Sequence, residues 1–206
     1  MNLNWERKFW KKGYQYVAGL DEAGRGPLAG PVFAAAVIIE NSRLTIKNLK
    51  DVNDSKKLSL KKREEVYELL INSPYIKWGI GSVSEKVIDR INILEATKEA
   101  MIKAIKDLKK KNKRIKIDYL MIDGNFSIKT EIPQKSIVKG DTKVFSCAAA
   151  SIIAKVRRDR MMGKYHKKYP QYCFDKHKGY PTRQHRLLIK KYGLSNIHRL
   201  TFNSSI

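Results

Sequence analysis

Two short apolar runs of β-prone residues lie close together near the start of the chain. They cover Tyr16 to Asp21 and Pro31 to Ile39, and the segment between them, Glu22 to Gly30, is rich in glycine and proline. Runs of this length and composition indicate strands, and glycine and proline between them indicate a tight connection. The pattern predicts a strand, a loop and a second strand that pair as a hairpin.

The rest of the chain alternates between predicted helices and predicted strands. In chain order, the expected elements are a helix over Ser59 to Ile71, a strand over Tyr75 to Val83, a helix from Ser84 to about Lys111, a strand over Ile115 to Ile122, a short run at Lys135 to Val138, a buried helix over Phe145 to Val156 and a helix over Thr182 to Lys191. This order predicts an α/β fold in which helices flank a mixed sheet. The basic and aromatic stretch from Arg157 onward is expected to form a small helical C-terminal appendage.

The balance of charge points to a polyanionic partner. Lys and Arg number 43 against 20 Asp and Glu, which gives a formal charge of +23. Solubility alone needs a net charge of only about 2 to 8 in magnitude. Nucleic acid is therefore the first partner to consider, and an acidic membrane surface is the second. Charge does not separate an enzyme from a non-catalytic nucleic-acid-binding protein.

The termini, apolar runs and cysteines predict a cytoplasmic protein. The first 12 residues are polar and carry no apolar targeting segment, and the longest apolar runs, such as Val32 to Ile39, are far shorter than the roughly 20 residues that span a bilayer. Cys147 and Cys173 form no C-x-x-C pair. So few cysteines indicate a reducing compartment, and no membrane partner is expected.

Four acidic residues stand at or near the ends of apolar elements. Asp21 and Glu22 follow the first strand directly, and Asp123 and Asp141 each lie beside a glycine. Adjacent like charges at the end of a buried strand are costly unless a cation compensates them. Carboxylate oxygens suit Mg²⁺ or Mn²⁺, so a shared metal site is the chemical interpretation. The alternative is that each acid is an ordinary cap or turn residue.

The segment Gly24-Arg25-Gly26 follows the first acidic pair. Two glycines let the backbone approach a ligand closely, and the arginine offers a planar set of donors to phosphate or sugar oxygens. The spacing does not match a dinucleotide-binding fingerprint, because Pro27 lies inside it and two acids precede it. The chain also lacks a P-loop sequence, which excludes that class of nucleotide hydrolase.

All four histidines lie in the basic C-terminal stretch, at His166, His177, His185 and His198. Their spacing matches neither H-E-x-x-H nor a Cys/His zinc site. We expect them at the surface or in contact with phosphates, rather than as metal ligands. A serine-based hydrolase is set aside because the chain has no G-x-S-x-G sequence.

Taken together, these blocks resemble the ribonuclease HII family. The segment Asp21-Glu-Ala-Gly-Arg-Gly-Pro-Leu-Ala-Gly-Pro-Val32 is similar to the signature of that family. Further similar blocks follow in the same order: Asp54-Ser-Lys-Lys-Leu-Ser59, Ile122-Asp-Gly-Asn125, Gly140-Asp141, Ala148-Ala-Ala-Ser-Ile-Ile-Ala-Lys155, Arg158-Asp159, His177-Lys-Gly-Tyr-Pro-Thr182 and Ile197-His-Arg199. The resemblance spans nearly the whole chain.

The resemblance implies a ribonuclease H-like catalytic core over residues 1–160 and a basic helical substrate-binding region over residues 161–206, which together can form one continuous domain. It also implies that Asp21, Glu22, Asp123 and Asp141 hold two Mg²⁺ or Mn²⁺ ions about 3.5 to 4 Å apart. Asp21 would bridge the ions. Glu22 and Asp123 would complete the metal on the leaving-group side, and Asp141 the metal on the nucleophile side.

Residues for substrate binding are also carried over from the family. Gly24, Arg25 and Gly26 would read the ribose 2′-hydroxyl, the group that separates RNA from DNA. Tyr180 would pack on the nucleotide at the RNA–DNA junction. Three cationic residues are candidates for phosphate contacts: Lys56, Lys155 and Arg158.

The implied activity is endonucleolytic cleavage of the RNA strand of RNA–DNA hybrids, and cleavage 5′ of single ribonucleotides in duplex DNA. The products would carry a 5′-phosphate and a 3′-hydroxyl, which fits ribonucleotide excision repair and DNA replication. A monomer is expected. No partner motif stands out in Phe202 to Ile206, so a link to a sliding clamp has no support from the sequence. The remaining alternatives are a non-catalytic binding protein and another nuclease with the same core, such as a Holliday-junction resolvase or an integrase-like enzyme.

Overall fold

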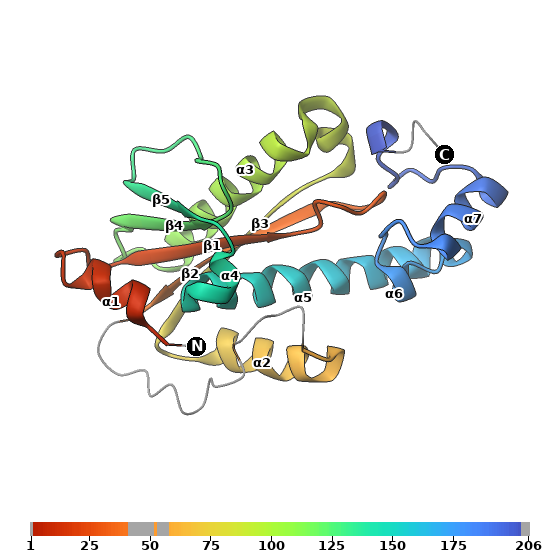
Figure 1. The fold of residues 1–206 in the computed structure, drawn as a ribbon. Helices are drawn as coiled ribbons and strands as arrows, with labels where there is room; N and C mark the ends of the chain where they lie inside the picture. The colour runs from red at the N-terminus through yellow and green to blue at the C-terminus, as the bar shows by residue number, and fades with distance from the viewer. Residues whose placement is uncertain (1, 41–51, 53–57, 203–206) are drawn as a thin grey trace.

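A mixed sheet of five strands forms the centre of the computed structural model, which describes residues 2–40, 52 and 58–202. In chain order the strands are β1 (Val17–Ala23), β2 (Val32–Ile39), β3 (Ile76–Val83), β4 (Tyr119–Asp123) and β5 (Gln134–Ile137). They lie side by side in the order β3-β2-β1-β4-β5 (Figure 1). The first strand of the chain therefore sits in the middle of the sheet.

The pairing of the strands confirms the predicted hairpin and mixed sheet. Strands β1, β2 and β3 are antiparallel neighbours, while β4 is parallel to β1 and β5 is parallel to β4. The parallel register places Leu20 of β1 opposite Ile122 of β4. The residues that follow this pair are Asp21 and Asp123, so the register brings two carboxylates together at the same end of neighbouring strands.

Helices cover both faces of the sheet, as predicted. The longest are α2 (Leu60–Asn72), α3 (Glu85–Lys111), α5 (Phe145–Lys168) and α7 (Arg183–Tyr192); the shorter ones are α1 (Asn4–Trp10), α4 (Gly140–Lys143) and α6 (Phe174–His177), with 3-10 turns at Pro170–Tyr172 and Leu200–Phe202. Helix α3 packs on one face, and α5 and α2 lie on the other (Figure 1). A side chain at Gly19 of β1 would collide with Ser146 and Cys147, so this glycine lets α5 approach the middle of the sheet.

Several predicted boundaries differ from those in the structure. The strand expected from Ile115 begins only at Tyr119, and α1 was not expected within the polar first 12 residues. Helix α5 continues to Lys168, because its more polar second half still buries Arg158 and Met162 on one side. The division of the chain at residue 160 stays a prediction, and α5 continues through that position.

The C-terminal part packs against the far half of α5 (Figure 1). A small apolar cluster joins the two, formed by Ala29, Met162, Tyr172, Phe174 and Ile197. Ala29 belongs to the loop between β1 and β2, so the C-terminal part also contacts that loop. Within the described residues, no helix has both the length and the apolar character needed to cross a membrane.

Candidate active site

Three aspartates meet at one edge of the sheet. Asp21 lies on β1 and Asp123 ends the parallel neighbour β4, while Asp141 lies on the short helix α4 beside them. Each offers a carboxylate oxygen, and these oxygens lie within 4.8 Å of one another. The predicted convergence of these three acids is therefore present in the fold.

Backbone amides fix two of these carboxylates. The amide of Glu22 donates to Asp21 Oδ1 at 2.6 Å, and the amide of Gly140 donates to Asp123 Oδ1 at 2.7 Å. The second bond ties the start of α4 to the end of β4. The acids are thus held in place by the backbone before any ligand binds.

The burial and mutual repulsion of the three aspartates favour the binding of a cation. Asp21 is only 4% exposed and Asp141 only 3%. Burial raises the pKa of Asp21 well above its usual value, and the negative charges of Glu22 and Asp123 raise this pKa further. A hydrogen bond from Ser151 acts in the opposite direction. Several carboxylates that oppose one another's ionisation at one buried point form a site suited to a hard divalent cation.

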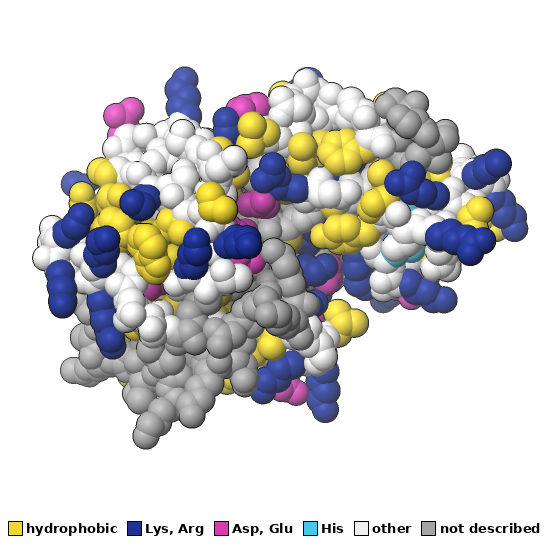
Figure 2. Space-filling model, viewed as in Figure 1, with side chains coloured by type: hydrophobic (Ala, Val, Ile, Leu, Met, Phe, Trp, Pro, Cys, Tyr) yellow, Lys and Arg dark blue, Asp and Glu magenta, His cyan; other side chains and the backbone are white. Residues whose placement is uncertain are grey.

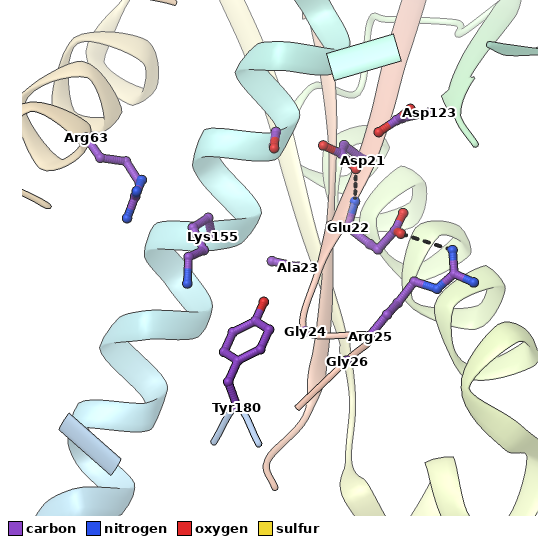
Figure 3. Close-up of a pocket in the computed structure, with 11 residues that line it drawn as sticks. Asp21, Glu22, Ala23, Gly24, Arg25, Gly26, Arg63, Asp123, Lys155 and Tyr180 are labelled. Carbon is purple, nitrogen blue, oxygen red and sulfur yellow. Dashed lines mark hydrogen bonds and ion pairs between the residues drawn. The ribbon is translucent and has the colours of Figure 1, made fainter. Parts of the chain in front are cut away.

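Glu22 lies next to the aspartates but points another way. Gly19 and Asp21 face α5, so the alternation of a strand turns Glu22 away from that face (Figure 3). Its Oε1 pairs with Arg25 Nη1 at 3.3 Å. Its Oε2 is buried and has no hydrogen-bond partner among the described residues. Burial raises the pKa of Glu22, although the charge of Arg25 opposes this effect. A buried carboxylate oxygen without a donor is a good metal ligand, so Glu22 fits the predicted metal site.

A cleft of about 240 Å³ opens beside the acids. It is lined by Asp21, Glu22, Ala23, Gly24, Arg25, Gly26, Arg63, Asp123, Ser151, Lys155 and Tyr180. The β1 residues line one side and α5 with Tyr180 the other (Figure 3). Figure 2 shows Asp and Glu side chains near the middle of this face of the molecule, with Lys and Arg side chains spread around them. The cleft therefore combines carboxylates with a basic surround.

The Gly24-Arg25-Gly26 segment forms the rim of this cleft directly after β1. Gly24 has a φ of 101°, and a side chain there would collide with Arg158. A side chain at Gly26 would approach only the ring of Tyr180, at 3.9 Å. Gly24 is therefore required by the packing behind the loop, whereas Gly26 leaves space in front of it.

Tyr180 stands across the cleft from this segment (Figure 3). Its side chain is 38% exposed, and the Lys155 ammonium lies 5.6 Å from its ring centroid. Lys155 also pairs with Asp159 at 2.7 Å. Tyr180 and Lys155 thus present an aromatic face and a cation to the same cleft. Lys56 lies outside the described residues.

The expectation of phosphate contact is wrong for Arg158. Its side chain is fully buried, and it donates to the carbonyl oxygens of Pro31, Ala29 and Lys178 at 3.0 to 3.1 Å. The basic composition of the chain concealed this role, because a buried and an exposed arginine look alike in the sequence.

The expectation of surface positions is also wrong for three of the histidines. His177, His185 and His198 are buried, and the rings of His177 and His185 stack at 4.2 Å. Nδ1 of His185 contacts the Tyr180 carbonyl at 2.9 Å, and its Nε2 contacts Nε2 of His198 at 3.1 Å. Burial lowers the pKa of His185 and of His198 to about 4. These neutral rings form part of the C-terminal core.

Two polar residues of the cleft were not predicted as site residues. Ser151 lies on the apolar face of α5 and bonds to Asp21. A serine within an apolar helical run is a signal that was available in the sequence. Arg63 lies on α2, donates to the Leu58 carbonyl at 2.9 Å and pairs with Asp159 at 3.8 Å. Nothing in the local sequence marks Arg63, because the fold alone brings α2 beside α5.

Comparison with known proteins identifies relatives along nearly the whole chain. Residues 18–205 match the family described as ribonuclease HII. The chain is 50% identical to ribonuclease HII of Syntrophus aciditrophicus over 199 residues, covering 97% of this chain and 89% of the relative. It is 51% identical to ribonuclease HII of Chlamydia muridarum over 193 residues, covering 94% and 84%.

Solved structures show the same fold. Ribonuclease H2 from Pyrococcus horikoshii superposes with a TM-score of 0.69 at 31% identity, over 90% of this chain and 93% of that one. Ribonuclease HII from Archaeoglobus fulgidus, solved in a complex with PCNA, gives 0.72 at 26% identity, over 90% and 94%. The fold and the extent of the sequence match agree. The chain therefore belongs to the ribonuclease HII family and is a metal-dependent endoribonuclease that acts on RNA–DNA hybrids.

Proposed function

We propose that this protein cuts the phosphodiester bond 5′ of a ribonucleotide, both in RNA–DNA hybrids and at single ribonucleotides in duplex DNA. The products carry a 5′-phosphate on the ribonucleotide and a 3′-hydroxyl on the upstream strand. One observation supports this proposal above all. Asp21 and Glu22 precede the Gly24-Arg25-Gly26 segment by a single residue, and both line one cleft with it, so a phosphate at the acids brings the neighbouring sugar to the loop.

The four acids are the proposed catalytic and metal-binding residues. Asp21, Asp123 and Asp141 offer oxygens close to one another, and Glu22 offers a buried oxygen beside them. Two Mg²⁺ or Mn²⁺ ions, when bound, supply an activated water and stabilise the leaving oxygen. Asp21 would be shared between the two ions, Glu22 and Asp123 would hold the ion on the leaving-group side, and Asp141 would hold the ion on the nucleophile side.

The residues around the acids select the substrate. Backbone groups of Gly24, Arg25 and Gly26 recognise the 2′-hydroxyl, which only the ribonucleotide carries. The ring of Tyr180 packs against the nucleotide at the RNA–DNA junction, which its exposed face permits. The net charge of +23 supplies affinity for the phosphate backbone without reading the sugar. Lys56 is a further candidate for a phosphate contact.

One chain supplies all these groups, which supports action as a monomer. We place the activity in the cytoplasm, in ribonucleotide excision repair and in DNA replication. A single embedded ribonucleotide is the characteristic substrate of the first process, and RNA–DNA hybrids arise in the second.

A panel of labelled substrates tests the proposal. The protein is incubated with Mg²⁺ or Mn²⁺ and, separately, with a duplex carrying one ribonucleotide, an all-DNA duplex and a four-way DNA junction. Cleavage of the first substrate alone is expected. Equal cleavage of all three, or cleavage of the junction alone, would identify a different nuclease of this fold. Binding without cleavage would identify a non-catalytic protein.

A further inference from the structure

Two buried arginines donate hydrogen bonds to the loop that joins β1 to β2. Arg199, from the C-terminal segment after α7, donates from Nη2 to the Gly24 carbonyl at 2.6 Å and from Nη1 to the Arg25 carbonyl at 3.0 Å. Its Nε and Nη2 also donate to the Gly30 carbonyl, at 2.9 and 2.8 Å. One side chain thus holds both ends of the loop together.

Arg158 of α5 donates to the same loop at the end that leads into β2. Its Nε donates to the Pro31 carbonyl and its Nη2 to the Ala29 carbonyl, both at 3.1 Å. Its Nη1 donates to the Lys178 carbonyl at 3.0 Å, which links the loop to the C-terminal part. Five carbonyls of the loop therefore accept hydrogen bonds from the two guanidinium groups, namely those of Gly24, Arg25, Ala29, Gly30 and Pro31.

This arrangement is electrostatically costly. Both side chains have no exposed surface. Burial lowers the pKa of Arg199 to about 9, and the positive charge of Arg158 contributes to this shift. Burying two neighbouring cations is unfavourable unless their donors are well used. The planar guanidinium has five donors in a fixed geometry, which lysine cannot imitate. The hydrogen bonds to the loop carbonyls use these donors and hold the loop in one geometry.

The orientation of the carbonyls determines where the amides point. The described chain has no cis peptide bond, so the N–H of each residue points opposite to the carbonyl before it. The Gly24 carbonyl faces Arg199, which turns the amide of Arg25 away from that side. The Arg25 carbonyl faces Arg199 as well, which turns the amide of Gly26 away in the same manner. Arg25 and Gly26 both line the cleft.

We infer that Arg199 and Arg158 are positioning residues for ribose selection. Their hydrogen bonds orient the loop carbonyls towards the interior of the protein, so the amides of Arg25 and Gly26 point towards the sugar in the cleft. This inference rests on the proposed function, because it assumes that the loop reads the 2′-hydroxyl. It makes the C-terminal segment a determinant of sugar specificity, although Arg199 itself is buried and does not contact the substrate.

Other contacts make the loop a well-defined unit. The amide of Leu28 donates to the Gly179 carbonyl and the amide of Gly30 to the Ile197 carbonyl, each at 2.8 Å. The amide of Arg199 in turn donates to the Leu28 carbonyl at 2.8 Å. Backbone bonds thus hold the middle of the loop, whereas the Gly24 and Arg25 carbonyls accept from Arg199. Replacing Arg199 is therefore expected to disturb the sugar-reading end first.

The test measures binding to two duplexes that differ by one hydroxyl group. Asp123→Asn is the parent, because it blocks cleavage, and the dissociation constants for a duplex with one ribonucleotide and for its all-DNA counterpart are measured with Mg²⁺ present. The parent is expected to prefer the ribonucleotide about fivefold or more, the factor for one or two hydrogen bonds. Adding Arg199→Lys, which preserves the charge, is expected to reduce this preference to near one and to leave DNA affinity within about twofold.

Arg157→Lys is the matched control. Arg157 lies next to Arg158 on α5, but its side chain is exposed. The control is expected to keep the full preference. If the parent shows no preference, the proposed reading of ribose fails. If the parent and Arg199→Lys show the same preference, ribose reading stands and the inference about Arg199 is overturned.

Two further measurements cover variants that fold poorly. Guanidinium ion added to Arg199→Ala is expected to restore the preference, while tetramethylammonium is not; loss without rescue would contradict the inference. In the wild-type protein, hydrogen exchange at the amides of Leu28 and Gly30 is expected to be slow. Exchange there as fast as at an unfolded chain would show that the loop is not held, and would overturn the inference without any variant.

Discussion

Replacing Asp123 by asparagine is expected to stabilise the metal-free protein while abolishing activity. The carboxylate oxygens of the three aspartates lie within 4.8 Å of one another. Two unit charges at that distance repel by roughly 3 kcal/mol at an effective dielectric constant of about 20. Asp123 is partly exposed, which screens its charge. We therefore expect a net gain of about 1 kcal/mol in the free energy of unfolding. The asparagine Oδ1 still accepts from the Gly140 amide, so the local structure is preserved.

Thermal unfolding with and without metal measures this effect. In EDTA the melting temperature of Asp123→Asn is expected to rise by about 2 to 4 °C, the change that 1 kcal/mol produces in a chain of this size. Saturating Mg²⁺ or Mn²⁺ is expected to stabilise the wild-type protein by about 3 kcal/mol at 100 times the dissociation constant, and the variant by much less. Glu99→Gln is the control, because Glu99 forms an exposed ion pair with Lys103 on α3. A lower melting temperature of Asp123→Asn in EDTA would show that the three carboxylates do not repel one another, and an unchanged gain on adding metal would show that Asp123 does not bind it.

Three more predictions follow from the cleft and the C-terminal core. Tyr180→Ala is expected to lower kcat/KM on the single-ribonucleotide duplex by about tenfold, while Tyr180→Phe retains most of it, because stacking is worth about 1 to 3 kcal/mol; equal losses in both would refute a stacking role. Gly24→Ala is expected to destabilise the fold more than Gly13→Ala in chemical denaturation, because both have positive φ but only the first meets a collision. The folded-state pKa of His185 and of His198 is about 4 against 6.5 when unfolded. The contribution of each neutral ring to the free energy of unfolding is therefore complete above pH 6.5. It is lost as the pH falls towards 4, by roughly 3 kcal/mol for one ring. A free energy of unfolding that stays constant over that range would contradict this.

The sequence was sufficient to predict the alternation of elements and the acids. Apolar runs of strand length ended at Asp21 and Asp123, and an acid at the end of such a run is a signal that the local sequence carries. The register between β1 and β4 brings the two acids together, and that register depends on pairing between residues about 100 positions apart. The convergence was therefore a prediction that only the fold was able to test.

The buried cations were not predictable from the sequence. Arg158 and Arg199 lie in basic stretches where an exposed phosphate contact is the ordinary interpretation. Their burial depends on carbonyl groups of a loop more than 120 residues away in the chain. The histidines were misassigned for the same reason, since His185 and His198 are buried by one another and by Phe174. Local patterns do not show which polar groups a distant backbone will satisfy.

The most direct test of the proposed function is to map the cut in a duplex that carries a single ribonucleotide. The wild-type protein, with Mg²⁺ or Mn²⁺, is incubated with this duplex labelled at either end, and the products are resolved at single-nucleotide resolution and their end groups identified. One cut is expected, directly 5′ of the ribonucleotide, with a 5′-phosphate on the ribonucleotide and a 3′-hydroxyl upstream. A cut on the 3′ side of the ribonucleotide, a 2′,3′-cyclic phosphate end, or cleavage at deoxynucleotides would contradict it.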